Sequence, residues 1–591
     1  MCGIFGYVGR QRSDLSSLLL RKLSKLDYRG YDSAGIAVLH KKHFQIRKSV
    51  GEVNDLKSKL RGIKISGAVG IGHTRWATHG GVSVKNAHPH KDCSGNIVVV
   101  HNGIVENFEV LKKDLLKKGH RFTSDTDTEV FAHLVEEESK SKNFLKAVRD
   151  SFKKLKGLNA IVVANNDGEL VGLKRGSPLV LGVKGEEKFI SSDTPLLSDI
   201  TSRIFIIEED EGIYINNDVV KTITLGSDKK SVPKFRIIKI NQNKVEKKGF
   251  KHYLLKEIYE QPQVVMNIAD NNKQNIMETA RMIKDAWGTY FTACGTAAHA
   301  GLAATYMFSE IAERHVNFSF GSEFPYYEDF LVERSLLIAA SQSGETMDTL
   351  EAVRAAKRHG SKVLALVNVP GSSLERISDK TLYLNAGPER AVLSTKAYIA
   401  KLSLFLLISY SMLGEYEKGV SLLRRSARSL KRIFNVEYQR KLKRLSKRLM
   451  NKDHIYIIGR GLNYPTALEG ALKIKEASYI HAEGFAGGEL KHGVIALVEK
   501  GTPCICIVAE DRAKEAILSN AMELKSRGAE IIGISPKKYN VFDFHLEVED
   551  VSTASPIVNI VPMQLMAYYI TILKDLNPDK PRNLAKSVTV K

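Results

Sequence analysis

A cysteine stands directly behind the initiator methionine, in the opening segment MCGIFGYVGR. Cysteine is small enough for the methionine to be removed, which would leave Cys2 with both a thiol and a free α-amine. Because an α-amine titrates near a pKa of about 8, part of it is unprotonated at neutral pH and can accept the thiol proton. Cys2 is therefore a candidate nucleophile that carries its own base. The alternative is an ordinary second residue of a buried first strand.

Three further segments of the N-terminal part hold polar side chains that a cysteine nucleophile would need. Arg75, in HTRWATHG, is a bidentate partner for a carboxylate. In HNG, the Asn102 amide and the Gly103 N–H group are candidate oxyanion donors. Asp127, in SDTDTE, is a candidate anchor for an ammonium group. Two alternatives stay open, because Arg75 could form a surface ion pair and Asp127 could be a helix N-terminal charge.

The C-terminal half holds a second group of candidates. SQSGET (341–346) follows an apolar strand and precedes a helical pattern, so its hydroxyl and N–H groups would gather at a helix N-terminus and could bind a phosphate. An ordinary Ser-capped helix is the alternative. STK (394–396) lies on a similar strand-to-loop approach and would complete the pocket. Lys473 and Glu476 would share one face of a helix, although such pairs are most often surface ion pairs.

Two further residues of the C-terminal half could take part in acid–base or covalent chemistry. His492, in the glycine-bounded ELKHG, is a candidate acid or base near neutral pH. Lys586, in the terminal PRNLAKSVTVK, could be desolvated and form a Schiff base with a ketone, although a frayed terminus is the alternative.

We expect no metal and no cofactor. The histidines of AHPH match no standard set of metal ligands, and five scattered cysteines without a CxxC pair predict neither a disulfide framework nor a zinc site. SQSGET lacks the GK[ST] ending of a nucleotide P-loop, and GRGLNYP lacks the third glycine of a dinucleotide fingerprint.

Composition predicts a large globular protein without a nucleic-acid or membrane partner. A chain of 591 residues, 43% hydrophobic and 26% charged, is too long for one core. The net charge of +22 is densest at residues 421–450, where Leu442, Leu445 and Leu449 keep a helical spacing, so we interpret this segment as a solvated helix face. The apolar run at 398–413 is too short to span a bilayer, and no signal-peptide pattern precedes the first strand. We expect a cytoplasmic protein.

The pattern of elements divides the chain into successive blocks. Residues 1–240 hold short β-type runs interleaved with helical stretches and predict an α+β domain. Residues 241–265 form a lysine-rich linker that ends in a helix start. Residues 266–440 and 441–580 each begin with a strand, a glycine turn and a helix, which predicts two doubly wound parallel-sheet α/β domains that arose by duplication. Residues 581–591 form a separate C-terminal tail.

Together, CGIFGYVG, LDYRGYDSAGIA, HTRWATHG, NAHPH, VVVHNGIVEN and SDTDTEV closely resemble the class II glutamine amidotransferases, whose glutaminase domain is an N-terminal-nucleophile (Ntn) hydrolase. The resemblance implies that Cys2 attacks the glutamine amide, releases ammonia and leaves a glutamyl thioester. It also implies that Asn102 and Gly103 form the oxyanion hole, and that Arg75 and Asp127 hold the glutamine carboxylate and amine. Thr78 and His79 would line the pocket, and Trp76 would gate the passage of ammonia.

With HYLLKEIYEQP, SQSGET and the terminal SVTV, the resemblance extends to amidotransferases that carry two sugar isomerase (SIS) domains and act on fructose 6-phosphate. It implies conversion of L-glutamine and fructose 6-phosphate to glucosamine 6-phosphate and glutamate by a homodimer, with ammonia channelled between the domains. His492 from the neighbouring subunit would open the sugar ring, and Lys586 would form an imine with the ketone. Glu476 with Lys473 would then move protons. The implied sugar-phosphate ligands are Thr296, Ser341, Gln342, Ser343, Thr346, Ser394 and Lys396.

Three other functions are considered. An amidotransferase could use another keto sugar phosphate. A non-enzymatic SIS regulator would bind a sugar phosphate but would have no use for Cys2, Arg75 and Asn102. A phosphoribosyl-pyrophosphate amidotransferase would need an acidic pyrophosphate-binding loop, which we do not find in the sequence.

Overall fold

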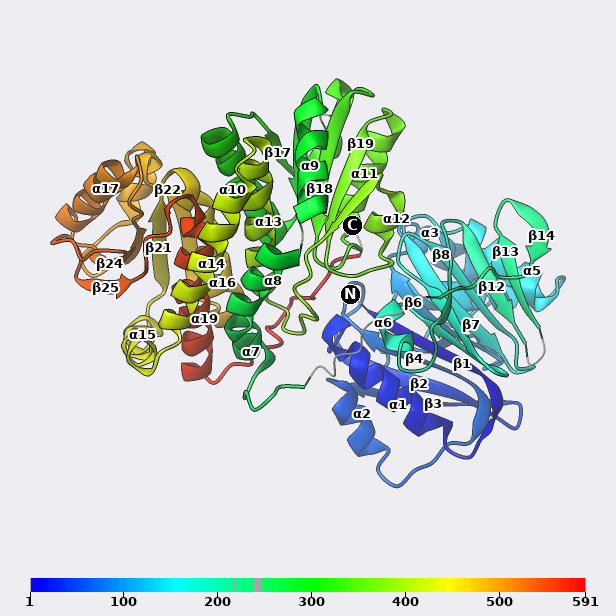
Figure 1. Cartoon of the computed structure of the whole chain (residues 1–591). Coiled ribbons are helices and arrows are strands. Elements are labelled where there is room, and N and C mark those ends of the chain that lie inside the picture. Colours follow the sequence, from blue (N-terminus) through cyan, green and yellow to red (C-terminus); the bar gives the residue numbers. More distant parts are fainter. Residues whose placement is uncertain (1, 217–218, 238–245, 272, 327, 590–591) are drawn as a thin grey trace. The chain divides into compact units, whose positions relative to one another are not determined.

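The computed structural model describes residues 2–216, 219–237, 246–271, 273–326 and 328–589, and it divides into two compact units (Figure 1). The N-terminal unit comprises Met1–Lys244 together with Ala585–Lys591, and the C-terminal unit comprises Val245–Leu584. The last residues of the predicted tail therefore group with the N-terminal unit, where the Ser177 hydroxyl lies 3.4 Å from the Thr589 carbonyl oxygen.

Two antiparallel sheets form the centre of the N-terminal unit. One has the strand order β15-β11-β9-β10-β1-β4-β2-β3 and the other β14-β13-β12-β8-β7-β6-β5. The strands are β1 (Gly3–Arg12), β2 (Ser33–His40), β3 (His43–Val50), β4 (Gly67–Arg75), β5 (His90–Lys91), β6 (Ile97–Gly103), β7 (Asn159–Asn165), β8 (Leu170–Arg175), β9 (Val180–Lys184), β10 (Glu187–Ser191), β11 (Arg203–Ile206), β12 (Glu211–Ile215), β13 (Val220–Thr224), β14 (Ser227–Ser231) and β15 (Arg236–Ile237).

The alternation of side chains along these strands produces four layers. Ile4 and Val8 of β1 point into an apolar core between the sheets, whereas Phe5 and Tyr7 pack against helices on the other face. Those outer helices are α1 (Leu15–Leu26), α2 (Val53–Lys59) and α6 (Thr194–Leu197). The second sheet is covered by α3 (Phe108–Lys117), α4 (Glu129–Ser139) and α5 (Phe144–Lys153). This α/β/β/α arrangement places the ends of β1, β4 and β6, which carry the predicted glutamine site, beside one another.

The C-terminal unit holds two parallel five-stranded sheets of the same strand order. One is β17-β16-β18-β19-β20 and the other is β22-β21-β23-β24-β25. In each sheet the strand that comes second along the chain is an edge strand and pairs with the strand that comes first. The strands are β16 (Gly288–Ala293), β17 (Asn317–Phe320), β18 (Ser335–Ser341), β19 (Lys362–Val367), β20 (Lys380–Tyr383), β21 (His454–Gly459), β22 (His481–Ala486), β23 (Pro503–Ile507), β24 (Glu530–Ser535) and β25 (Phe544–Glu547). The shared order confirms the predicted pair of doubly wound domains.

Helices surround both sheets (Figure 1), with one large apolar core shared by the two sheets and a smaller separate core on the other face of each sheet. They are α7 (Tyr253–Tyr259), α8 (Gln261–Asn271), α9 (Lys273–Asp285), α10 (Gly295–Ala312), α11 (Met347–Arg358), α12 (Ser373–Ile377), α13 (Lys396–Met412), α14 (Tyr416–Ile433), α15 (Val436–Leu449), α16 (Tyr464–Ser478), α17 (Lys514–Ser526), α18 (Ser555–Asn559) and α19 (Val561–Leu573). The predicted helix start in the linker is confirmed by α7, whereas residues 241–245 lie outside the described residues.

Three stretches of unusual composition, two apolar and one basic, are explained by how they pack on this core. The run at 398–413 belongs to α13, whose side chains are almost all buried. The stretch 552–573 is long and apolar enough to cross a membrane by composition alone, but 83% of its most apolar window is buried inside the protein, as in a core helix. The basic segment forms α14 and α15, with Leu442, Leu445 and Leu449 buried and the arginines exposed, which confirms the predicted solvated face.

Candidate functional site

Cys2 lies immediately before β1, half-buried against the end of β4. The Trp76 N–H group donates a hydrogen bond to the Cys2 Sγ at 3.3 Å, and the Asn102 Nδ2 donates to the Cys2 carbonyl oxygen at 3.0 Å. Burial raises the pKa of the Cys2 thiol, and the hydrogen bond from Trp76 opposes that rise. The structure therefore brings the predicted nucleophile, Trp76 and the predicted oxyanion donor Asn102 into direct contact.

A buried histidine fixes the orientation of the Asn102 amide. His73 Nε2 lies 2.9 Å from the His101 carbonyl oxygen and 3.2 Å from Asn102 Oδ1. Both partners are acceptors, so Nε2 carries the proton and Asn102 turns its NH₂ group toward Cys2. Burial lowers the pKa of His73 to about 3, so the ring stays neutral at physiological pH. Sequence reasoning missed His73 as a positioning residue, although it opens the HTRWATHG segment.

The backbone conformation at position 103 requires a glycine. Its φ of +137° lies in a region that side chains with a Cβ rarely adopt, and a Cβ there would lie 2.1 Å from the Leu158 carbonyl oxygen. The bend ends β6 directly after Asn102, which leaves the two predicted oxyanion donors adjacent.

Arg75 and Asp127 are both buried, at 3% and 4% exposure, so the alternative of a surface ion pair at Arg75 is wrong. The Arg75 guanidinium donates to the carbonyl oxygens of the following loop, at 3.0 Å to Gly80 and 3.3 Å to Gly81. Asp127 Oδ2 accepts a hydrogen bond from the Val105 N–H at 2.7 Å and precedes the N-cap of α4. Burial lowers the pKa of Arg75, and the charges of Cys2 and Asp127 oppose that effect.

The remaining residues of the predicted glutamine site lie on the loop after β4. Thr78 is exposed, and His79 packs edge-on against Phe108 with ring centroids 5.3 Å apart. Asp32 is a further residue of this site that sequence reasoning did not single out. Its Oδ2 accepts a hydrogen bond from the Ala77 N–H at 2.7 Å and so orders this loop. The only signal for it was its place in LDYRGYDSAGIA.

The histidines of AHPH are neutral core side chains. His88 stacks on His73 with ring centroids 4.1 Å apart, and His90 Nε2 lies 3.1 Å from the Thr126 hydroxyl. Burial lowers the pKa of His88 and of His90 well below the ordinary value.

SQSGET forms a compact turn between β18 and α11 in the C-terminal unit. The Ser341 hydroxyl lies 2.8 Å from the Thr346 hydroxyl and 3.5 Å from that of Ser343, and it accepts from the Gly344 N–H at 3.0 Å. Gly344 has a φ of +68°, and a Cβ there would lie 2.2 Å from the Ser372 hydroxyl. Gln342 is half-buried and uses its carbonyl oxygen to accept from the Asn368 N–H at 3.1 Å. The turn thus gathers three hydroxyl groups at the N-terminus of a 12-residue helix, where an anion is favoured.

Lys473 lies on α16 at the centre of a buried group of charges. Its Nζ is 2.6 Å from Glu476 Oε2, 3.4 Å from Glu469 Oε1 and 3.0 Å from the Thr296 hydroxyl. Burial lowers the pKa of Lys473, but the two carboxylates outweigh this, so the net shift is upward and the ammonium stays charged. Because the Lys473 side chain is 1% exposed, the surface-pair interpretation is wrong.

Glu469 and His299 complete this group and were missed by sequence reasoning. Glu469 is fully buried, and its Oε2 lies 2.8 Å from His299 Nδ1 of α10. The available signal was the spacing of Glu469 four residues before Lys473 on the same helix. The contact joins α16 of the second sheet domain to α10 of the first.

The STK segment is held by carboxylates that sequence reasoning did not identify. Lys396 Nζ lies 2.7 Å from Glu260 Oε2 of α7, and the Ser394 hydroxyl donates to Glu389 at 3.1 Å. Thr296 likewise contacts Lys473. No hydrogen bond in the described part of the chain joins these three side chains to the SQSGET turn.

His492 and Lys586 lie in different units. His492 ends a 3₁₀ segment, Gly487–His492, and is exposed. Lys586 is half-buried and belongs to the tail segment that groups with the N-terminal unit.

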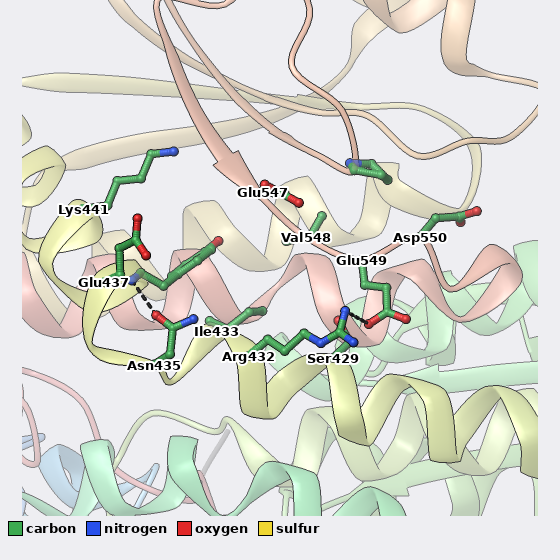
Figure 2. A pocket seen from close by; sticks show the side chains of 12 residues that line it. Ser429, Arg432, Ile433, Asn435, Glu437, Lys441, Glu547, Val548, Glu549 and Asp550 are labelled. Atoms are coloured by element: carbon green, nitrogen blue, oxygen red, sulfur yellow. Dashed lines mark hydrogen bonds and ion pairs between the residues drawn. The ribbon is translucent and has the colours of Figure 1, made fainter.

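A groove of about 500 Å³ lies between α14, α15 and the segment that follows β25 (Figure 2). Charges of both signs line it, and Arg432 pairs with Glu549 at 3.1 Å. None of the predicted site residues lines this groove, so we assign no substrate to it.

Comparisons with known proteins cover the whole chain. A glutamine amidotransferase domain model matches residues 73–199, and a SIS domain model matches residues 282–409 and 448–574. The chain is 43% identical over 608 residues to a glutamine--fructose-6-phosphate aminotransferase [isomerizing] of Thermococcus kodakarensis, and 42% identical over 601 residues to one of Pyrococcus horikoshii; each alignment covers 100% of both chains.

One solved structure extends the likeness to the C-terminal unit. The C-terminal domain of a glucosamine-fructose-6-phosphate aminotransferase from Francisella tularensis aligns with a TM-score of 0.53 and 34% sequence identity. The alignment covers 57% of this chain and 100% of that domain.

Proposed function

The chain belongs to the glutamine--fructose-6-phosphate aminotransferase (isomerizing) family, and we propose how its residues divide the reaction of that family. The protein is an enzyme that converts fructose 6-phosphate and L-glutamine to glucosamine 6-phosphate and glutamate. The N-terminal unit supplies the amide nitrogen, and the C-terminal unit rearranges the sugar.

The observation that carries the assignment of the glutaminase is the contact of Asn102 and Trp76 with Cys2. The Cys2 thiolate attacks the carboxamide carbon of glutamine, and the Asn102 Nδ2 with the Gly103 N–H stabilises the oxyanion that forms. Collapse of this intermediate expels ammonia and leaves a thioester, which water hydrolyses to glutamate. The α-amine of Cys2, exposed by removal of Met1, accepts the thiol proton and returns it to the leaving amine.

Arg75 and Asp127 hold the two charged ends of the glutamine backbone. Both are buried, and the charges of Cys2 and Asp127 act on Arg75. Arg75 already donates to the loop that follows it, and Asp127 already accepts from the Val105 N–H after β6. Thr78 and His79 line the pocket, and Trp76, which also contacts the Cys2 thiol, controls the departure of ammonia.

In the C-terminal unit, the SQSGET turn binds the phosphate of the sugar. Ser341, Ser343 and Thr346 offer converging hydroxyl groups, and the N-terminus of α11 offers N–H groups. Gln342, Thr296, Ser394 and Lys396 complete the binding of the sugar phosphate in this proposal. The cation of Lys396 is balanced by Glu260, so its role is to position the loop.

Glu476 transfers the proton in the isomerisation, and Lys473 holds it in place. Lys473 stays charged between Glu469 and Glu476, so it acts as a fixed cation that orients the Glu476 carboxylate. Lys586 forms an imine at the ketone carbon, and ammonia from glutamine replaces the oxygen at C2. His492, from the partner subunit of a cytoplasmic homodimer, opens the sugar ring.

The reaction is tested with glutamine labelled with ¹⁵N in its amide and with fructose 6-phosphate. We expect one labelled nitrogen in a hexosamine phosphate. The product is identified by its mass and by anomeric NMR signals of the 2-amino aldose. Glutamate without amino sugar would contradict the assigned acceptor. A higher kcat/KM with another keto sugar phosphate would show that the substrate is that sugar.

Lys586 is tested by trapping its imine. A lysine attacks a ketone through its neutral amine, and the imine that forms can be reduced to a stable adduct. Borohydride added with fructose 6-phosphate should leave a sugar adduct on the peptide that contains Lys586. Lys586→Arg should lose synthesis and keep glutaminase activity, whereas the control Lys574→Arg should keep both. An adduct on Lys473 or Lys396 would show that the role belongs elsewhere.

A further inference from the structure

Four side chains that the proposed reaction does not use gather in the N-terminal unit: Cys93, His120, His133 and Glu136. Each offers one ligand atom, and the four atoms lie within 4.8 Å of one another. They come from three segments: the turn between β5 and β6, the loop between α3 and α4, and α4 itself. Both histidines are buried, Glu136 is half-buried, and Cys93 is exposed, so the cluster is open to an ion from solvent.

The spacing of these atoms is close to that of a tetrahedral zinc site. Zinc binds thiolate sulfur at about 2.3 Å and imidazole nitrogen or carboxylate oxygen at about 2.0–2.2 Å, which puts sulfur and nitrogen roughly 3.6 Å apart. Cys93 Sγ lies 3.5 Å from His133 Nδ1 and 3.8 Å from His120 Nδ1. Glu136 Oε2 lies 2.9 Å from His120 Nδ1 and 3.1 Å from His133 Nδ1. A small movement of the two nitrogens away from the carboxylate oxygen would complete the tetrahedral geometry.

The outer nitrogens of both rings face a second carboxylate. His120 Nε2 lies within hydrogen-bond distance of Glu137 Oε2, at 3.1 Å, whereas His133 Nε2 makes no hydrogen bond within the described residues and lies 3.7 Å from Glu129 Oε1. Metal-bound histidines are usually oriented in this way, with one nitrogen on the ion and the other donating to a carboxylate. The Arg121 N–H donates to Cys93 Sγ at 3.4 Å, as it would to a metal-bound thiolate.

Carboxylate oxygens flank both ring nitrogens of His120, at 2.9 Å from Nδ1 and 3.1 Å from Nε2. A carboxylate only accepts, and a neutral imidazole carries a single N–H, so a ring that donates through Nε2 leaves Nδ1 as a lone pair directed at the cluster. The cluster also offers a thiol and a carboxylate, and their combined charge of −2 when ionised would balance a divalent ion.

We propose that Cys93, His120, His133 and Glu136 bind one structural Zn²⁺ ion. All three segments adjoin the glutamine site: Cys93 leads through β6 to Asn102, His120 leads through residues 121–126 to Asp127, and Asp127 precedes α4. The ion therefore holds the scaffold of that site and takes no part in the chemistry at Cys2. Sequence reasoning predicted no zinc site because the ligands lack a compact motif, with Cys93 and His120 27 positions apart.

The first test measures metal content in the full-length protein, purified without a polyhistidine tag from zinc-containing medium. We expect about one zinc per chain in the wild-type protein. Cys93→Ser and His133→Gln should each contain less than about one tenth of the wild-type zinc, and the control Cys294→Ser should contain as much as wild type. Chelation should lower the unfolding temperature of the wild-type protein and leave that of Cys93→Ser unchanged. A zinc content that is equal in Cys93→Ser and in wild type would overturn the proposal.

The second test needs no variant and so does not depend on how variants fold. X-ray absorption of the zinc protein should show one sulfur at about 2.3 Å and three nitrogen or oxygen ligands at about 2.0–2.2 Å. Replacement by Co²⁺ should give a sulfur-to-cobalt charge-transfer band. Failure of the wild-type protein to bind Zn²⁺ or Co²⁺ at a ratio of one, with a doubly protonated His120 ring seen by NMR, would assign the cluster to an imidazolium network instead. A sulfur-free zinc site would equally contradict the proposal.

Discussion

The two sites differ in the buried side chains that position their reacting groups. In the N-terminal unit the histidines packed around the oxyanion donor Asn102 are neutral at physiological pH, since burial lowers the pKa of His73 to about 3 and those of His88 and His90 well below their ordinary values, and Arg75 and Asp127 are the buried charges proposed to bind the substrate. In the C-terminal unit the buried groups are charged and paired, with Lys473 between Glu469 and Glu476 and Lys396 against Glu260.

The difference corresponds to the chemistry of each site. Attack on an amide creates charge only in the transition state, and neutral donors such as Asn102, oriented in advance, stabilise that charge without needing a counter-ion. Isomerisation of a sugar moves a proton between carbon atoms and needs a carboxylate in a fixed place. A buried cation such as Lys473 holds the carboxylate in place. The loss of one member of such a network leaves a buried charge without its partner and destabilises the fold.

The largest expected effect separates the two chemistries. Cys2→Ala removes the nucleophile, so glutamine-dependent synthesis should fall by more than about 10³-fold. Isomerisation of fructose 6-phosphate by the same protein should stay close to the wild-type rate, because it depends on Glu476 and Lys586 and on none of the glutamine-site residues. Both rates are measured on one preparation by coupled assay. Loss of both activities in a folded Cys2→Ala protein would show that the units are not independent.

The next effect tests the paired charges of the C-terminal unit. Lys473→Met leaves Glu469 buried without its cation and should lower the free energy of unfolding of this unit by roughly 3–5 kcal/mol. Trp287 reports on this unit and Trp76 on the other, so denaturation is followed in Trp76→Phe and Trp287→Phe backgrounds. Lys475→Met, at an exposed position of the same helix, is the matched control. Equal stability of the two variants would contradict the buried network.

The smallest effect per residue is the dependence on pH. The folded pKa values of His73 and His88 lie below the unfolded value of about 6.5, so the unfolded chain binds more protons as the pH falls, and stability present above that pH is lost below it. Each such histidine should cost the N-terminal unit about 1 kcal/mol between pH 6.5 and 5.5.

The C-terminal unit should respond at lower pH. Burial alone would raise the pKa of Glu260, but hydrogen bonds from Lys396 and Lys256 lower it overall, so its contribution is retained until the pH falls below about 4.3. Urea denaturation at several pH values, followed by the two tryptophans, measures both responses. A stability of the N-terminal unit that is constant from pH 7 to 5.5 would show that these histidines are protonated in the folded protein.

The sequence alone determined the order of the elements and the identity of most reacting groups. Strand and helix periodicity predicted β1, β6, β18 and both doubly wound domains, because those patterns reflect which faces are buried. Cys2 and Asn102 were predicted from their segments, since a nucleophile and its oxyanion donors need particular residue types.

Only the tertiary structure decided how distant residues combine. Glu469 with His299, and Cys93 with His120 and His133, meet because helices and loops pack together, and no short motif records such contacts. Burial likewise separated the neutral histidines from the paired charges, and it excluded the alternative of a surface ion pair at Arg75 and at Lys473. The physical reason is that solvation is set by the surrounding fold, so the protonation and strength of a side chain follow from packing and cannot be read from its neighbours in sequence.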